Sequence, residues 1–343
     1  MTIDPRQRVP LGRTDLEVTR LAFGGASIGG LFAEVDDATA IAAVRHAWDL
    51  GIRTFDTAPL YGYGASERRF GAALAAHPRD EFVMSTKVGR LVRTPSTIAA
   101  GADIDRQLLD GREDAYYVRQ EPARIVFDYS ADGIRRSLEE SLARLGLDRV
   151  DIALIHDPDD HWDAAIGEAW PALERLRAAG VIGAVGAGMN QSAMLARFAR
   201  ETDMDVFLIA GRYTLLDQGA LEELLPACLE RGIAVFVGGV MNSGVLADPR
   251  PGARFNYRPA PPAVIERAQR IGEVCERHSV PLRAAAMQFP LAHPAVVSLV
   301  AGVRSTEHLD EYPALLSYPI PAELWSELRD GGLIAPDAPV PVS

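Results

Sequence analysis

Four polar side chains that could move a proton lie near the ends of apolar segments: Asp56, Tyr61, Lys87 and His156. A lysine beside a tyrosine favours the phenolate and lowers the phenol pKa from its usual value of about 10, and an aspartate can hold and partly neutralise that lysine. A histidine can hydrogen-bond an oxygen beside the phenol. Such a set suits adding a proton to a carbonyl oxygen or removing one from an alcohol.

The stretch 51–67, GIRTFDTAPLYGYGASE, places the aspartate and the tyrosine five residues apart. Residues 52–55 alternate in polarity as a half-buried strand does, and the following Ala-Pro-Leu must end that strand. Asp56 then lies at the strand end and Tyr61 on the loop, where two glycines allow a sharp turn before a helix opens at Ser66. This order of elements is typical of a βα active-site loop.

The rest of the chain repeats this alternation of strand and helix. Strands are predicted at 18–23, 52–55, 81–87, 150–155, 181–190, 206–211, 233–239 and 296–302. Helices are predicted at about 37–50, 66–77, 131–145, 163–179, 191–201, 219–231, 263–278, 282–291, 306–316 and 322–330. The pattern favours a (β/α)8 TIM barrel with extra C-terminal helices over a doubly wound sheet. With no linker to split the chain, residues 1–343 are expected to form one domain.

In a barrel, the carboxyl ends of all strands open on one face, so the four polar side chains should converge there from the second, third and fourth strands. Each has a structural alternative when taken alone. An aspartate can cap a turn, and a tyrosine after a proline-containing turn can simply pack. The spacing across consecutive strands is what indicates a functional site.

A long insertion, residues 88–122, follows the third predicted strand. It is polar, mixed in pattern and far longer than an ordinary βα loop. Loops of this length are usually lids or disordered, and this one is expected to roof the site. Three of its side chains could reach a substrate: Tyr116, Tyr117 and Arg119.

The composition is that of an ordinary soluble globular protein. The formal charge of −12 and the pI near 5.1 argue against nucleic acid or an anionic membrane as the main partner, which leaves a small molecule. Cys228 and Cys275 form no disulfide framework and are interpreted as buried thiols. No signal-peptide pattern and no run of 18 apolar residues occurs, so a cytoplasmic location is the default expectation; the oligomeric state is left open.

Two further motifs receive structural interpretations. HDPDDH (156–161) carries enough carboxylates and histidines to bind a divalent metal, but Asp159 or Asp160 is predicted to be the N-cap of the next helix, and no metal is expected. GYGASE (62–67) starts like a dinucleotide fingerprint but has Glu67 where the last glycine should be, and GAVGAG (183–188) has the wrong spacing. Both are interpreted as tight turns, so no Rossmann domain is indicated.

The stretch 51–67, the strand ending STKVG, the strand ending at His156 and the late AGVRSTEHLDE (301–311) resemble the aldo-keto reductase superfamily over nearly the whole chain. The resemblance implies that Asp56, Tyr61, Lys87 and His156 are a catalytic tetrad, with Tyr61 as proton donor or acceptor. It also implies that a nicotinamide cofactor lies across the barrel mouth and carries the hydride.

Several positions depart from the common pattern of that superfamily. Gly188 and Met189 stand where many members have a Ser-Asn pair that holds the carboxamide, and Asn190 is the proposed substitute. Gly238 and Gly239 stand where a tyrosine often stacks on the nicotinamide. With HDPDDH, these departures look most similar to the branch that contains L-fucose and D-threo-aldose 1-dehydrogenases and a pyridoxal 4-dehydrogenase.

The turn at 301–311 is expected to meet the adenosine end of the cofactor, with Gly25 and Gly302 as further cofactor contacts. His308 aligns with the arginine that usually holds a 2′-phosphate, which favours NAD, although Arg304 could be recruited for NADP. Glu311 is a candidate for the adenine amine. The structural alternative for this turn is an ordinary helix capped by Ser305 or Thr306.

The resemblance implies oxidation of the C1 hemiacetal hydroxyl of an L-fucose-like aldose to a lactone, or oxidation of pyridoxal at its hemiacetal. An NADPH-dependent aldehyde or ketone reductase is the alternative, because the same groups serve both directions. A Schiff-base aldolase using Lys87 and a non-catalytic cofactor-binding scaffold are less favoured. The candidates for substrate contact are Asp157, Asp160, His161 and Tyr117.

Overall fold

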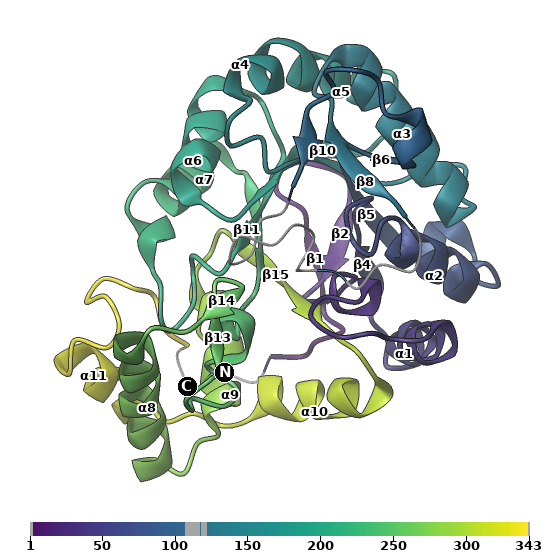
Figure 1. Ribbon diagram of the computed structural model, residues 1–343. Coiled ribbons are helices and arrows are strands. Elements are labelled where there is room, and N and C mark those ends of the chain that lie inside the picture. The colour runs from purple at the N-terminus through teal and green to yellow at the C-terminus, as the bar shows by residue number, and fades with distance from the viewer. Residues whose placement is uncertain (1–2, 107–116, 118–121, 342–343) are drawn as a thin grey trace.

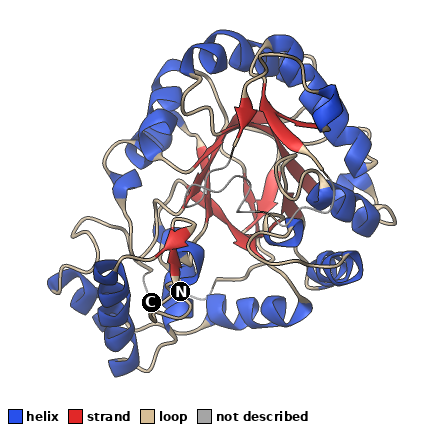
Figure 2. Ribbon diagram, in the orientation of Figure 1, coloured by secondary structure: helices blue, strands red, loops and turns tan. Residues whose placement is uncertain are grey.

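Eight parallel strands close into a barrel in the computed structural model, which describes residues 3–106, 117 and 122–341 (Figure 2). In chain order they are β3 (Leu21–Gly24), β4 (Thr54–Asp56), β5 (Val83–Val88), β9 (Ile152–His156), β10 (Ala184–Met189), β11 (Val206–Ala210), β12 (Ala234–Gly238) and β15 (Val296–Gly302). The last strand pairs with the first, with Leu299 opposite Leu21. The predicted (β/α)8 barrel is therefore confirmed.

Helices surround the barrel and bury their apolar faces against its outer wall (Figure 1). They are α1 (Asp37–Asp49), α2 (Ala65–Leu74), α3 (Ala131–Leu145), α4 (Trp162–Ala164), α5 (Trp170–Ala178), α6 (Ser192–Glu201), α7 (Leu224–Arg231), α8 (Pro262–Arg277), α9 (Leu282–Gln288), α10 (Thr306–Ser317) and α11 (Ala322–Asp330). The helices α8 and α11 lie side by side near the two ends of the chain. The extra C-terminal helices that the sequence predicted are α10 and α11.

An N-terminal hairpin closes the amino-terminal end of the barrel. Its strands β1 (Arg8–Pro10) and β2 (Glu17–Thr19) are antiparallel, and they carry Leu11 and Val18 into the apolar cluster of the barrel interior. Both side chains are fully buried there with inward-facing residues such as Leu154 and Phe236. The interior is therefore a packed core, and polar chemistry is confined to the opposite, carboxyl-terminal face.

The first predicted strand, 18–23, is wrong as a single element. It divides into β2, in the hairpin, and β3, in the barrel. The division falls at Thr19 and Arg20, where the Thr19 hydroxyl donates to the carbonyl of Leu21 at 2.8 Å and the Thr19 amide donates to the hydroxyl of Thr54 at 2.9 Å. These side-chain bonds link the end of the hairpin to the barrel strands where the chain passes from β2 to β3.

Three predicted helices are interrupted. The helix expected at 163–179 contains a π-helical segment, Ala165–Ala169, immediately before Pro171, whose ring and missing amide hydrogen disturb regular α-helix bonding. The helix expected at 282–291 ends at Gln288, ahead of a 3-10 turn that begins at Pro290. The helix expected at 219–231 starts as a separate 3-10 turn, Gly219–Leu221.

The predicted N-cap at Asp159 or Asp160 is also wrong. His161 precedes α4, and its side chain makes no capping hydrogen bond.

The insertion is partly an ordered antiparallel sheet. Its strands are β6 (Arg90–Arg93), β7 (Ile104–Asp105) and β8 (Arg124–Phe127), with β8 in the middle. Tyr117 forms a backbone bridge with Leu31, in the loop after β3. Two other residues that the sequence singled out, Tyr116 and Arg119, lie outside the described residues.

A buried ion pair fixes the start of α2, the helix that follows the loop of Tyr61. The fully buried carboxylate of Glu67 accepts hydrogen bonds from Arg144 Nε of α3 at 2.5 Å and from the Thr86 hydroxyl of β5 at 3.1 Å. One side chain therefore joins two helices to the third barrel strand. A buried charge of this kind is stable only while its partner is present.

Replacement of Arg144 by methionine is expected to lower the free energy of unfolding by about 3–5 kcal/mol, because Glu67 would keep a buried charge with no cation beside it. The matched control is Arg135→Met in the same helix, where the arginine pairs with exposed carboxylates and the loss should stay below about 1 kcal/mol. Urea denaturation of both variants measures the difference. Equal losses would contradict the role of the Glu67 pair.

Candidate active site

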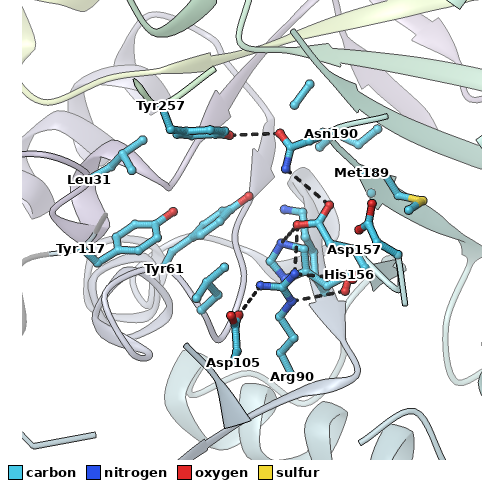
Figure 3. Close-up of a pocket in the computed structure, with 16 residues that line it drawn as sticks. Leu31, Tyr61, Arg90, Asp105, Tyr117, His156, Asp157, Met189, Asn190 and Tyr257 are labelled. Carbon is cyan, nitrogen blue, oxygen red and sulfur yellow. Dashed lines mark hydrogen bonds and ion pairs between the residues drawn. The ribbon is translucent and has the colours of Figure 1, made fainter. Parts of the chain in front are cut away.

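The four polar side chains predicted to converge do meet at the carboxyl-terminal face of the barrel, where Figure 3 shows Tyr61 and His156. Lys87 Nζ donates to Asp56 Oδ2 at 2.7 Å and to the Thr57 carbonyl at 3.0 Å. The ammonium nitrogen lies 4.6 Å from the centre of the Tyr61 ring. The ring of His156 meets the ring of Tyr61 edge to face, with 5.9 Å between their centres.

The electrostatics of Tyr61 differ from the sequence-based expectation. Burial raises the pKa of Tyr61 well above its usual value, and the nearby Asp56 carboxylate adds to the rise. The expectation of a phenol pKa below its usual value is therefore wrong, because the cost of burying a phenolate outweighs the effect of the nearby cations. Burial, aided by Arg90 and Lys87, also holds the pKa of His156 well below its usual value. Both catalytic-type rings are consequently neutral at physiological pH.

A cavity of about 330 Å³ opens beside these groups. Its lining combines leucines and tyrosines with an arginine, three aspartates and an asparagine, and Figure 3 shows Arg90, Asp105, Asp157 and Asn190 among them. The lining residues are Leu31, Leu60, Tyr61, Lys87, Arg90, Asp105, Tyr117, His156, Asp157, Asp159, Gly188, Met189, Asn190, Leu208, Ala210 and Tyr257. A ligand that fills this cavity would contact both apolar side chains and several hydrogen-bonding groups.

The backbone at the end of β9 turns sharply at Asp157, whose φ is +41°. The turn is held by side chains from the insertion and from the segment after it: Tyr129 donates to the His156 carbonyl at 2.6 Å, and Arg90 Nε donates to the same oxygen at 3.3 Å. A left-handed conformation is costly for an aspartate, and these bonds offset the cost. The turn sends the Asp157 side chain into the cavity.

Arg90 also bridges two carboxylates on the polar wall. Its guanidinium donates to Asp105 Oδ2 at 2.6 Å and to Asp157 Oδ2 at 3.2 Å. Burial raises the pKa of Asp157 to about 6, against the opposing effect of the Arg90 charge. The sequence analysis did not identify Arg90 or Asp105, because both lie in a segment interpreted as a loop.

Ionisation of Asp157 should make the free energy of unfolding depend measurably on pH. A carboxyl whose folded-state pKa is raised from 3.8 to about 6 contributes stability below pH 4 that is lost as pH rises through 6. Asp157→Asn should therefore be more stable than the wild type at pH 8, by up to about 3 kcal/mol, and this advantage should shrink to about 1 kcal/mol at pH 4.5.

Denaturation of the Asp157→Asn variant and the wild type at the two pH values measures this difference. Asp160→Asn, at an exposed neighbour, is the control and should change stability by less than about 0.5 kcal/mol at either pH. A difference between Asp157→Asn and the wild type that did not vary with pH would refute the assignment.

A tyrosine from a distant hairpin completes the cavity. Tyr257 lies in the turn between β13 (Arg254–Phe255) and β14 (Arg258–Pro259), with φ of +67°. Its hydroxyl donates to Asn190 Oδ1 at 3.2 Å, and Asn190 Nδ2 approaches Asp157 Oδ1 at 3.5 Å (Figure 3). The only sequence signal for Tyr257 is an aromatic residue in a Gly- and Pro-rich stretch after the seventh strand.

The other predicted site residues are divided between the cavity and its surroundings. Of the substrate candidates, Asp157 and Tyr117 line the cavity, and the Tyr117 ring stacks on Tyr61 with 5.9 Å between centres. Asp160 is exposed and does not line the cavity, and His161 pairs with Asp103 at 2.8 Å.

Of the cofactor candidates, only Asn190 lines the cavity. Arg304 donates to the Leu31 carbonyl at 3.0 Å, Glu311 pairs with Arg283, and His308 is exposed on α10. Four glycines follow or end barrel strands on the same face: Gly25, Gly238, Gly239 and Gly302.

Three observations bear on the other sequence-based expectations. Both cysteines are free and buried, as predicted. Within the described residues, no three His, Cys, Asp or Glu side chains are grouped so that they could hold a metal ion. None of the helices in the described part has the length and apolar content needed to cross a bilayer.

Comparison with known proteins agrees with the fold. The Aldo/keto reductase family model matches residues 20–330. A D-threo-aldose 1-dehydrogenase from Pseudomonas sp is 44% identical over 93% of this chain and 95% of its own length. A pyridoxal 4-dehydrogenase from Microbacterium luteolum is 42% identical over 98% of this chain and 100% of its own length.

A solved structure, the aldo-keto reductase AKR11C1 from Bacillus halodurans in its holo form, has a TM-score of 0.73 at 24% identity and covers 94% of this chain and 95% of its own. At this identity the likeness concerns the fold. The family match and the two relatives together define an NAD(P)-dependent oxidoreductase. The chain belongs to the aldo/keto reductase family.

Proposed function

We propose that this protein oxidises the C1 hemiacetal hydroxyl of an aldose, such as L-fucose, to a lactone, with oxidation of pyridoxal at its hemiacetal as a closely related activity. The observation that carries the proposal is the cavity in which Tyr61 and His156 face a wall of hydrogen-bonding side chains. A sugar has one reacting carbon and several hydroxyl groups, so it matches a site with one proton-transfer centre and a polar wall. The names of the two similar relatives support the same substrate classes.

In this mechanism the reacting oxygen lies between the Tyr61 hydroxyl and His156. The neutral imidazole donates a hydrogen bond that orients the oxygen. Oxidation needs Tyr61 as the phenolate, which accepts the proton of the hemiacetal hydroxyl, and in the reverse direction the phenol donates that proton to the carbonyl oxygen. Lys87, held by Asp56, lies over the phenol ring at 4.6 Å and stabilises negative charge that develops on it. When bound, a nicotinamide cofactor supplies the hydride acceptor.

The residues around the cavity fit a nicotinamide ring. Gly188 and Ala210 leave part of the wall almost free of side chains, and a Cβ at Gly188 would lie 3.3 Å from Lys87 Cε. Asn190 offers an amide at the edge of this space that could pair with the cofactor carboxamide. Tyr257 lies next to Asn190 and is the candidate to replace the aromatic side chain that Gly238 and Gly239 lack.

Reduction of an aldehyde or ketone with NADPH is the second candidate. Its support is the raised pKa of Tyr61, because a protonated phenol is ready to donate to a carbonyl oxygen. A Schiff-base aldolase is disfavoured, since Lys87 would have to be a neutral amine and instead forms an ion pair with Asp56. A non-catalytic scaffold would have no need of a buried, fully assembled proton-transfer site.

Preference for NAD over NADP is part of the proposal. The helix α10 carries three carboxylates around His308, and Arg304 is directed at a backbone carbonyl. A 2′-phosphate bound beside α10 would meet negatively charged side chains, and the helix itself contains no arginine that could pair with the phosphate. The carboxylates are Glu307, Asp310 and Glu311.

Tyr61→Phe is expected to reduce kcat about 100- to 10,000-fold, because the variant keeps the ring but cannot exchange a proton. Tyr213→Phe is the matched control: Tyr213 is buried away from the cavity, and its hydroxyl has no hydrogen-bond partner among the described residues. NADH absorbance with L-fucose, other aldoses and pyridoxal measures both variants. Full turnover by Tyr61→Phe would rule out the proposed proton transfer.

The wild type is expected to use NAD at least about tenfold more efficiently than NADP, and His308→Arg should narrow or reverse that preference by providing a cation for the 2′-phosphate. Fluorescence titration of both reduced cofactors into the two proteins gives their dissociation constants. Strong NADP preference in the wild type would show that another side chain binds the phosphate.

A further inference from the structure

The polar wall of the cavity contains a charged set that the proposed proton transfer does not use. Arg90, only 8% exposed, lies between Asp105 and Asp157. Burying three charged groups costs several kcal/mol per ion before their mutual attraction is counted. Because these three side chains line the same cavity as Tyr61 and His156, they are positioned to contact a bound ligand.

The three acidic side chains on this wall differ in how their oxygens are used. Asp105 accepts the short 2.6 Å bond from Arg90, and Asp159 accepts from Gln191 at 3.2 Å. Asp157 Oδ2 is bound to Arg90, the Asn190 backbone amide also bonds the carboxylate, and Asn190 Nδ2 lies 3.5 Å from Oδ1. A carboxylate oxygen can accept two hydrogen bonds, so Asp157 keeps acceptor capacity toward the cavity.

Asp157 also lies close to the centre of reaction. Its Oδ2 is 3.6 Å from His156 Nε2. If the reacting oxygen accepts a hydrogen bond from that nitrogen at about 2.8 Å, a hydroxyl on the neighbouring carbon falls within hydrogen-bond reach of the Asp157 carboxylate. A hydroxyl farther along the substrate would lie beyond the reach of this carboxylate.

We infer that Asp157, held in place by Arg90, binds the hydroxyl on the carbon next to the reacting carbon. The inference rests on the proposed function and narrows it: the substrates selected are those with a hydroxyl at that position. Arg90 is a positioning residue, because it acts on the substrate indirectly, by holding the Asp157 carboxylate and the His156 backbone in place. The apolar lining residues, Leu31, Leu60 and Leu208, accept the less polar part of the ligand.

A purely structural role for the pair makes a different prediction. If Arg90 and Asp157 only hold the His156 turn, their replacement would slow every substrate by the same factor. If Asp157 binds the neighbouring hydroxyl, its replacement would slow only substrates that carry this hydroxyl. The ratio of kcat/KM for an aldose to kcat/KM for its 2-deoxy counterpart separates the two roles.

The experiment measures this ratio for L-fucose and 2-deoxy-L-fucose with NAD. A hydrogen bond to a charged group contributes about 1.5–3 kcal/mol, so the wild type should prefer the hydroxylated sugar by about 10- to 100-fold. The preference should be reduced in Asp157→Asn, which keeps a neutral acceptor, and should be close to one in Asp157→Ala. Arg90→Lys should also reduce it, since lysine cannot bridge both carboxylates.

Arg93→Lys is the matched control, because Arg93 lies on the same strand but pairs with Glu140 at 2.9 Å, outside the cavity. Its ratio should equal that of the wild type. A ratio that stays at the wild-type value in Asp157→Ala, while both rates fall together, overturns the subsite and leaves the proposed function intact.

Failure of the proposed function would be recognised separately. If the wild type oxidises neither sugar, calorimetric titration of both sugars still tests the subsite. Tighter binding of L-fucose than of its 2-deoxy form, lost in Asp157→Ala, supports it. Equal binding of the two sugars by the wild type refutes it.

Discussion

The ion pair between Lys87 and Asp56 is the interaction on which the site depends. Its two side chains are only 1% and 2% exposed; the Ser85 hydroxyl donates to the aspartate, and the lysine also donates to the Thr57 carbonyl. Two adjacent barrel strands supply the charges, so the barrel register fixes their separation. Because the Tyr61 ring lies over the ammonium, the position of the phenol is tied to the barrel although Tyr61 itself belongs to a loop.

The face of the barrel around this pair carries two charged side chains that are paired with carboxylates and two aromatic rings that are neutral. Lys87 and Arg90 are the cations, each neutralised by at least one carboxylate, and the rings of Tyr61 and His156 lie between them without charge. This arrangement keeps the proton-transfer groups neutral in a poorly hydrated cavity. A substrate oxygen would therefore meet hydrogen-bond donors rather than an unbalanced charge.

Sequence patterns predicted the barrel and the meeting of Asp56, Lys87 and His156 because strand ends follow directly from hydrophobic periodicity. They failed where distant segments meet. Arg90 stands three residues after Lys87, yet its importance depends on how the insertion folds back onto β9. Tyr257 reaches Asn190 only through a left-handed turn in a hairpin. The predicted direction of the Tyr61 pKa shift was wrong because a sequence indicates which charges are near the phenol but not how deeply the phenol is buried from water.

The bonds from Arg90 and Tyr129 to the His156 carbonyl have a consequence for how such an enzyme can change its substrate. In many barrels, loops can be exchanged while the chemistry stays in the strands. Here the insertion that shapes the ligand space also supports the backbone of the histidine. A loop graft that omitted Arg90, Asp105 or their partners would disturb catalysis along with recognition. New specificity should therefore arise more easily from point changes within the insertion than from its replacement.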